Sequence, residues 1–95
     1  MIQVRRTAEY ASFEVVVREG KSESRHHVTM SQEMCKRLTA GKYTPERCIE
    51  AAFRFLLDRE PKESILKRFD VTAISRYFSE FEREMPRYLS QFDKQ

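Results

Sequence analysis

Glycine, proline and cysteine are all scarce in this chain of 95 residues, which has two glycines, three prolines and two cysteines. Because 40% of the residues are hydrophobic, this composition excludes collagen-like and low-complexity disordered chains and predicts a folded globular protein. The two cysteines do not form a disulfide-rich pattern, which favours a reducing, cytoplasmic location.

Long apolar runs are also missing. The longest ones, residues 15–17 and 55–57, are far too short to cross a bilayer, and residues 1–6 lack the apolar stretch of a signal peptide. We therefore expect a cytoplasmic protein with no membrane partner. The length fits one modest hydrophobic core, so we expect residues 1–95 to form a single domain.

The charged residues are spread evenly along the chain. Residues 1–30 carry five Lys/Arg and four Asp/Glu, residues 31–60 carry six and five, and residues 61–95 carry seven and six. Each third therefore contributes equally to the formal net charge of +3. Proteins that neutralise many phosphates concentrate their basic groups, so this distribution argues against a large nucleic-acid-binding surface.

Residues 44–59 carry the clearest helix pattern. Thr44 is suited to the N-cap, Pro45 to the first helical position, and Glu46 to the positive end of the helix dipole. The apolar residues that follow are spaced by three and four: Ile49, Ala52, Phe53, Leu56 and Leu57. Only a narrow polar strip remains, so we expect this helix to be central and covered on most sides.

Residues 1–30 form the predicted hairpin region, because side chains alternate between apolar and polar over residues 12–18 and again over residues 25–30. Gly20 lies in the polar break between these two segments. A turn of two residues and a turn of four residues both place the apolar side chains of the two segments on the same face of the hairpin. One face then carries Phe13, Val15, Val17, His26, Val28 and Met30, and the other carries Arg25, His27 and Thr29. Residues 1–10 alternate weakly, as a short edge strand would.

Residues 31–59 are predicted to form a helix-turn-helix pair. Ser31 is suited to cap a short helix over residues 32–39, and Gly41 is suited to the left-handed position that ends it. Pro61 ends the second helix of the pair, since the residue before a proline is pushed out of helical geometry.

Residues 62–95 are predicted to form a C-terminal helical region. Residues 65–69 contain an apolar patch of one or two helical turns, and the next apolar residues have the spacing of a packing helix: Val71, Ile74, Phe78, Phe81, Met85, Tyr88 and Phe92. Pro86 predicts a kink or break at residues 82–86. We expect residues 71–81 to pack on their own chain, a dimer seam being the alternative. The partly exposed partner surface is expected at Tyr88, Leu89 and Phe92.

No combination of residues typical of catalysis or of a cofactor site is present. The soft metal-ligand candidates lack the spacing that brings two ligands onto one face of an element: they are His26, His27, Cys35 and Cys48. Gly20 lacks the earlier glycine that a phosphate-binding loop requires. We therefore expect no metal, no cofactor and no enzymatic activity.

A strand, a short helix, a turn and a longer helix follow one another over residues 25–57, R-H-H-V-T-M-S-Q-E-M-C-K-R-L-T-A-G-K-Y-T-P-E-R-C-I-E-A-A-F-R-F-L-L. This order resembles the ribbon-helix-helix DNA-binding proteins. The resemblance implies that alternate strand side chains enter the major groove and that the second helix meets a phosphate with its N-terminus. Here the groove would take Arg25, His27 and Thr29, and the phosphate would meet Thr44. The family pairs this strand with its twin in a dimer, whereas residues 13–18 are expected to pair with it here.

These patterns predict an α+β fold in which an N-terminal antiparallel β-hairpin packs on three to four α-helices. We expect a small, bacterial-type, non-catalytic interaction module whose partner is another protein or a second copy of the chain in a homodimer. The alternative is a ribbon-helix-helix-like regulator whose partner is a nucleic acid, and which recognises DNA with the polar face of the hairpin.

Overall fold

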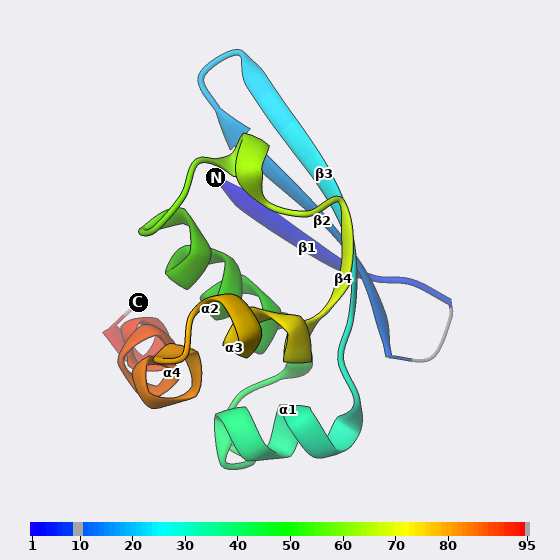
Figure 1. The fold of residues 1–95 in the computed structure, drawn as a ribbon. Helices are drawn as coiled ribbons and strands as arrows, with labels where there is room; N and C mark the ends of the chain where they lie inside the picture. Colours follow the sequence, from blue (N-terminus) through cyan, green and yellow to red (C-terminus); the bar gives the residue numbers. More distant parts are fainter. Residues whose placement is uncertain (9–10, 95) are drawn as a thin grey trace.

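The computed structural model describes residues 1–8 and 11–94, which form a four-stranded sheet and a layer of helices that covers one of its faces (Figure 1). The strands are β1 (Ile2–Arg6), β2 (Ser12–Glu19), β3 (Ser22–Thr29) and β4 (Arg68–Asp70). The α-helices are α1 (Gln32–Thr39), α2 (Pro45–Leu57), α3 (Ile74–Tyr77) and α4 (Phe81–Leu89). The short 3-10 helices are η1 (Lys62–Ser64), η2 (Val71–Ala73) and η3 (Ser90–Lys94). The predicted α+β class is confirmed.

The predicted hairpin is confirmed as β2 and β3, joined by the shorter of the two expected turns. The loop consists of Gly20 and Lys21, and Gly20 has a left-handed φ of 61°, which glycine adopts without strain. The register places Val15 opposite His26 and turns the whole predicted apolar set toward the helices, where it is buried. The expected edge strand is β1, which pairs antiparallel with β2.

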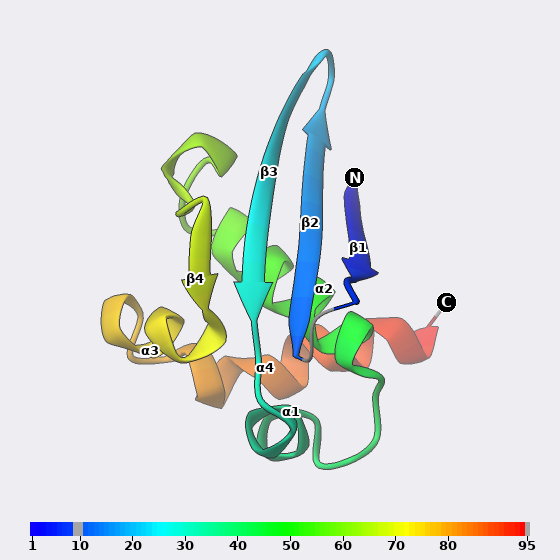
Figure 2. The ribbon, with the colours of Figure 1, turned by 90° about the vertical axis from the view of Figure 1, so that its right-hand side faces the viewer.

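The fourth strand makes the sheet mixed, whereas only an antiparallel hairpin was predicted. β4 lies at the sheet edge and runs parallel to β3 (Figure 2). Residues 65–69, predicted as helical turns, instead lead into this strand. A three-residue strand is too short for a periodic pattern, and its contacts come from residues distant in sequence. The Thr29 hydroxyl donates to Asp70, and the His27 N–H donates to the Lys67 carbonyl at 2.7 Å.

Both predicted N-caps are present. Ser31 accepts a hydrogen bond from the Met34 N–H at 3.0 Å, and Thr44 accepts one from the Arg47 N–H at 3.1 Å. Gly41 has a φ of 73° just beyond the end of α1, as predicted. Helix α1 therefore has the expected bounds, whereas α2 ends at Leu57, two residues before its predicted end and four before Pro61.

Helix α2 is central, as predicted, and is buried on two sides. Toward the sheet, the Phe53 ring packs on His26 and Phe69, with ring centroids 5.2 and 6.0 Å apart. Away from the sheet, the Phe55 ring meets Tyr88 of α4 at 5.7 Å. Because helix residues two positions apart point in nearly opposite directions, α2 joins two aromatic clusters, and it lies between the sheet and α4 (Figure 1).

The C-terminal helical region breaks earlier than predicted. A break at residues 82–86 is wrong, because the chain leaves helical geometry at Phe78, with φ −132° and ψ 94°, and α4 then continues through Pro86. The Phe78 ring packs edge-on against Phe55 at 5.9 Å, which fixes the break at that point. Pro86 lies on the exposed side of α4, where the carbonyl that loses its helical partner can bond to water.

Tyr88 and Leu89 belong to the core, so the expected partly exposed surface is wrong for both. Each is 2% exposed. The Tyr88 hydroxyl donates to Asp58 at the end of α2, which satisfies the polar end of a buried ring. Phe92 is half-buried, and two arginine guanidinium groups of α2 lie over its ring at 4.5 and 4.6 Å. A partner cannot reach Tyr88 or Leu89 unless α4 and η3 move, whereas Phe92 has the partial exposure that was expected.

Truncation of Phe53 to alanine is expected to lower the free energy of unfolding by about 3 to 5 kcal/mol, because it leaves a cavity between α2 and the sheet. Denaturant melts measure this change. Tyr77→Ala is the matched control, since Tyr77 is 71% exposed whereas Phe53 is 0% exposed, and it is expected to stay within about 0.5 kcal/mol of the unmodified protein. Equal stability of the two variants would contradict the central position of α2.

Candidate functional site

The open face of the sheet carries three of the residues predicted to contact DNA. Arg25, His27 and Thr29 alternate with buried residues along β3 and point away from the helices. Figure 2 looks onto this face, which the helices leave uncovered. Arg25 is exposed and pairs with Glu23 at 3.0 Å. Thr44 instead caps α2 in the helix layer, so the structure groups the three strand residues and leaves Thr44 apart from them.

Strand β3 has a partner on both of its edges. β2 pairs with it antiparallel along one edge, and β4 pairs with it parallel along the other. The twin-strand pairing that the ribbon-helix-helix resemblance implies needs one free edge of this strand. β4 occupies that edge at residues 27–29, and residues 22–26 pair with β2 alone.

His27 lies in a hydrogen-bonded relay that the sequence did not reveal. Its Nδ1 is 2.8 Å from Glu14 Oε1, and its Nε2 is 2.8 Å from Ser12 Oγ. This order of hydroxyl, imidazole and carboxylate is the one that serine hydrolases use. Ser12, however, is only 1% exposed, so a substrate does not reach its hydroxyl. These hydrogen bonds join Ser12 and Glu14 of β2 to His27 of β3 on the open face of the sheet. Both ring nitrogens of His27 therefore have partners within the chain.

The cysteine thiols are unreactive where the fold places them. Cys35 and Cys48 are both buried and unpaired. Burial raises the pKa of the Cys35 thiol and raises that of Cys48 to about 12, so both are protonated at neutral pH and are poor nucleophiles. Among residues 1–8 and 11–94, three or more potential ligands of the His, Cys, Asp or Glu type do not gather into a metal site.

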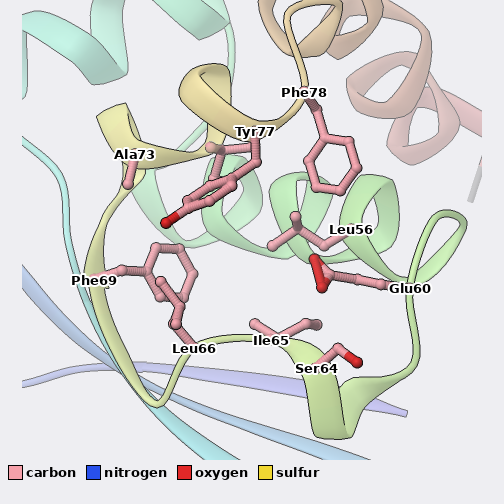
Figure 3. Close-up of a pocket in the computed structure, with 10 residues that line it drawn as sticks. Leu56, Glu60, Ser64, Ile65, Leu66, Phe69, Ala73, Tyr77 and Phe78 are labelled. Atoms are coloured by element: carbon pink, nitrogen blue, oxygen red, sulfur yellow. The ribbon is translucent and has the colours of Figure 1, made fainter.

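A small apolar pocket lies between the end of α2, the segment from η1 to β4, and α3 (Figure 3). Its volume is about 200 Å³. The apolar walls are Leu56, Ile65, Phe69, Ile74, Tyr77 and Phe78. Figure 3 shows Tyr77 reaching from α3 toward Phe69 on β4, and it shows Leu56 of α2 between Phe78 and Ile65. Segments distant in sequence thus form one concave site.

Two exposed apolar side chains border this pocket. Leu66 is 50% exposed and Tyr77 is 71% exposed, and only Met1 joins them as an exposed large hydrophobic residue in the part of the chain that the structure describes. Sequence reasoning placed Leu66 in a packing patch and counted Tyr77 among the aromatic residues in excess of the core, but the predicted partner surface included neither side chain. Their exposure has no local signature, because the same residue types fill the core.

Glu60 is the one acidic residue in the pocket lining. It follows α2 by three residues, and its side chain points into the pocket between Leu56 and Ile65 (Figure 3). Desolvation by burial raises the pKa of the carboxyl group, and no cation of residues 1–8 or 11–94 pairs with it. A carboxylate in apolar surroundings is unfavourable without such a partner. The pocket therefore contains a carboxylate acceptor that the described part of the chain does not satisfy.

A buried histidine holds one wall of the pocket. His26 is 1% exposed; its Nδ1 lies 2.8 Å from the Leu66 carbonyl oxygen and its Nε2 lies 2.8 Å from Ser24 Oγ. This geometry fits a neutral ring that donates from Nδ1 and accepts at Nε2. Burial lowers the pKa of His26, which keeps the ring neutral. The predicted inward position of His26 is confirmed, and its bond to Leu66 joins the hairpin to the pocket.

The chain has no match among known proteins in any of three comparisons. No family model, no curated protein and no solved structure matches the chain. In the described part of the chain, every helix is too short or too polar to cross a membrane. The candidate site therefore rests on the geometry of the pocket alone.

Replacement of His26 by glutamine, which does not titrate but can still donate to the Leu66 carbonyl, is expected to reduce the acid sensitivity of the fold. The unfolded chain binds a proton at the ordinary pKa of histidine, about 6.5, whereas burial lowers the folded pKa. Stability from His26 is thus complete above pH ~6.5 and is lost as the pH falls toward the folded pKa, by at most about 1.4 kcal/mol per pH unit.

Unfolding free energies of both proteins between about pH 7 and pH 5 test this expectation. The carboxylates titrate in both the unmodified protein and His26→Gln. The difference between the two slopes of unfolding free energy against pH therefore isolates the contribution of His26. Parallel pH profiles would show that the ring does not resist protonation in the fold.

Proposed function

We propose that this chain is a small, non-catalytic, cytoplasmic interaction module that holds a segment of a protein partner in the pocket between α2, β4 and α3. The observation that carries the proposal is the pair of exposed apolar side chains, Leu66 and Tyr77, at the border of an apolar cavity. Exposed apolar groups gathered around a concavity are typical of binding surfaces. Two unpaired cysteines support the reducing location.

The size of the pocket favours a side chain as its occupant. Pockets for cofactors and drug-sized molecules measure about 300 to 1,000 Å³. The cavity here is about 200 Å³, close to the cavity of about 150 Å³ that holds a single benzene ring in an engineered protein core. A site of this volume fits one large side chain of a partner.

The neighbouring sheet edge supports an extended segment as the carrier of that side chain. β4 is the edge strand of the sheet, and its Phe69 side chain lies in the pocket wall. An edge strand leaves one row of its backbone N–H and C=O groups without a strand partner. Extended peptides bind such edges by adding a strand while their side chains enter adjacent pockets. The proposed partner segment makes both kinds of contact.

DNA recognition by the open sheet face is the second candidate function. Each of the four strands presents one exposed arginine there, namely Arg5, Arg18, Arg25 and Arg68. Three acidic residues on the same face, Glu14, Glu23 and Asp70, offset most of this charge. A nearly balanced face attracts phosphates weakly, so the pocket supports the stronger proposal.

Replacement of Tyr77 by serine is expected to weaken peptide binding about tenfold or more, because the ring is part of the proposed contact surface. A random peptide library is selected on the immobilised chain, and the affinities of the recovered peptides are measured for both proteins. Lys36→Ser, at an exposed position on α1, is the matched control and is expected to bind as the unmodified chain does.

Peptides that bind Tyr77→Ser unchanged would contradict the pocket as the site. Light scattering of the same proteins identifies a second copy as the partner if a dimer dissociates on the Tyr77 substitution. Duplex DNA that binds at low salt and is released by Arg25→Ala would support the second candidate function instead.

A further inference from the structure

We infer that the pocket receives a single basic side chain, an arginine or a lysine of the partner segment, with Glu60 as its counter-ion and with Phe69, Tyr77 and Phe78 as its aromatic walls. This inference rests on the proposed function and names the chemistry of the partner. The pocket supplies both parts of a site for an organic cation, which are a carboxylate and the faces of aromatic rings.

The isolation of the Glu60 carboxylate is unusual in this chain. Among the acidic side chains that the structure describes, only Glu33 and Glu60 lack an ion pair or a hydrogen bond. Glu33 is exposed on α1, where water solvates it. Glu60 is half-buried among apolar side chains, where solvation is incomplete and a cationic partner is worth more.

The chain already holds its own arginines in the same way. The Arg59 guanidinium lies 3.7 Å from the centre of the Phe55 ring and pairs with Glu80 at 3.0 Å. Arg54 lies 4.6 Å from the centre of the Phe92 ring and pairs with Glu50 at 2.9 Å. Each of these sites combines an aromatic ring, a carboxylate and a guanidinium. The pocket repeats the first two groups and lacks the third.

The other classes of side chain fit less well. An acidic group would be repelled by Glu60. A neutral apolar group would fill the cavity but would remove more water from a carboxylate that it cannot pair with, which is costly. An arginine or lysine side chain has an apolar stem that matches the walls and a charged end that reaches the carboxylate.

The surroundings of the pocket limit the partner to one such cation. Lys67 and Arg76 adjoin Leu66 and Tyr77 in the chain, are exposed, and form no ion pair in the described structure. They repel additional basic groups. We therefore expect the basic residue of the partner segment to be flanked by neutral or acidic residues.

Glu60→Gln is the decisive variant, because it keeps the shape of the side chain and removes its charge. The full chain, labelled with ¹⁵N, is titrated with alanine-based pentapeptides whose central residue is arginine, lysine, citrulline or norleucine. Citrulline matches the shape of arginine without its charge, and norleucine matches the apolar stem of lysine. Amide shifts of the residues around the pocket report the site, and their saturation gives the affinity.

The arginine peptide is expected to bind at the pocket about tenfold or more tightly than the citrulline peptide, a difference of about 1.4 kcal/mol by the affinity relation. The lysine peptide is likewise expected to bind the pocket more tightly than the norleucine peptide. Both preferences are expected to vanish in Glu60→Gln and to persist in Glu33→Gln, the matched control at the other unpaired glutamate. Unchanged melting curves confirm that both variants fold.

Equal binding of charged and neutral peptides at the pocket would overturn the inference and leave the proposed function standing. The same conclusion holds if library-selected peptides bind the pocket without a basic residue. If neither the pentapeptides nor the selected peptides shift the amides around the pocket, the proposed function and the inference both fail.

Discussion

The packing of α2 between two aromatic clusters is the interaction on which the rest of the structure depends. Phe53 closes the core on the sheet side, and Phe55 closes it on the side of α3 and α4. Neither layer is large enough to bury α2 alone, since the sheet offers one face and α4 has only nine residues. The C-terminal third is therefore part of the core, and Tyr88 is fixed there by the Asp58 carboxylate at the end of α2. The open face of the sheet and the pocket are both places where this packing leaves surface uncovered.

The pocket forms where the sheet and the C-terminal helices no longer cover the end of α2. α2 stops at Leu57, the chain turns at Pro61, and β4 then joins the sheet while α3 approaches from the other direction. His26 holds the Leu66 carbonyl, so the wall on the β4 side is pinned to the hairpin. The opposite wall is α3, a helix of four residues that carries the exposed Tyr77. Glu60 lies between these two walls, and no arginine of the described residues pairs with it as Arg59 pairs with Glu80.

The parts of the fold that were predictable have strong local patterns. The repeat of apolar residues over residues 44–59 and the alternation along the hairpin specify their elements without knowledge of the partner surfaces. β4 was missed because three residues carry no period and its pairing with β3 bridges about forty residues. The same limit applies to the site. The burial of Tyr88 depends on Asp58, and the isolation of Glu60 depends on which cations fail to reach it. Both are tertiary properties, so the sequence predicted exposure for Tyr88 and Leu89, which are buried, and did not identify the pocket.

The central claim is that the pocket contains an unpaired carboxylate that binds a cation. The most direct test is a pH titration of Glu60, followed by the ¹³C NMR shift of its carboxyl carbon. In the free chain, desolvation is expected to raise its pKa above the ordinary value for glutamate. Saturation with the arginine pentapeptide is expected to lower that pKa, because a bound guanidinium favours the charged form. The citrulline peptide is expected not to lower it. A free-chain pKa at or below the ordinary glutamate value, or one that the arginine peptide leaves unchanged at saturation, would contradict the account.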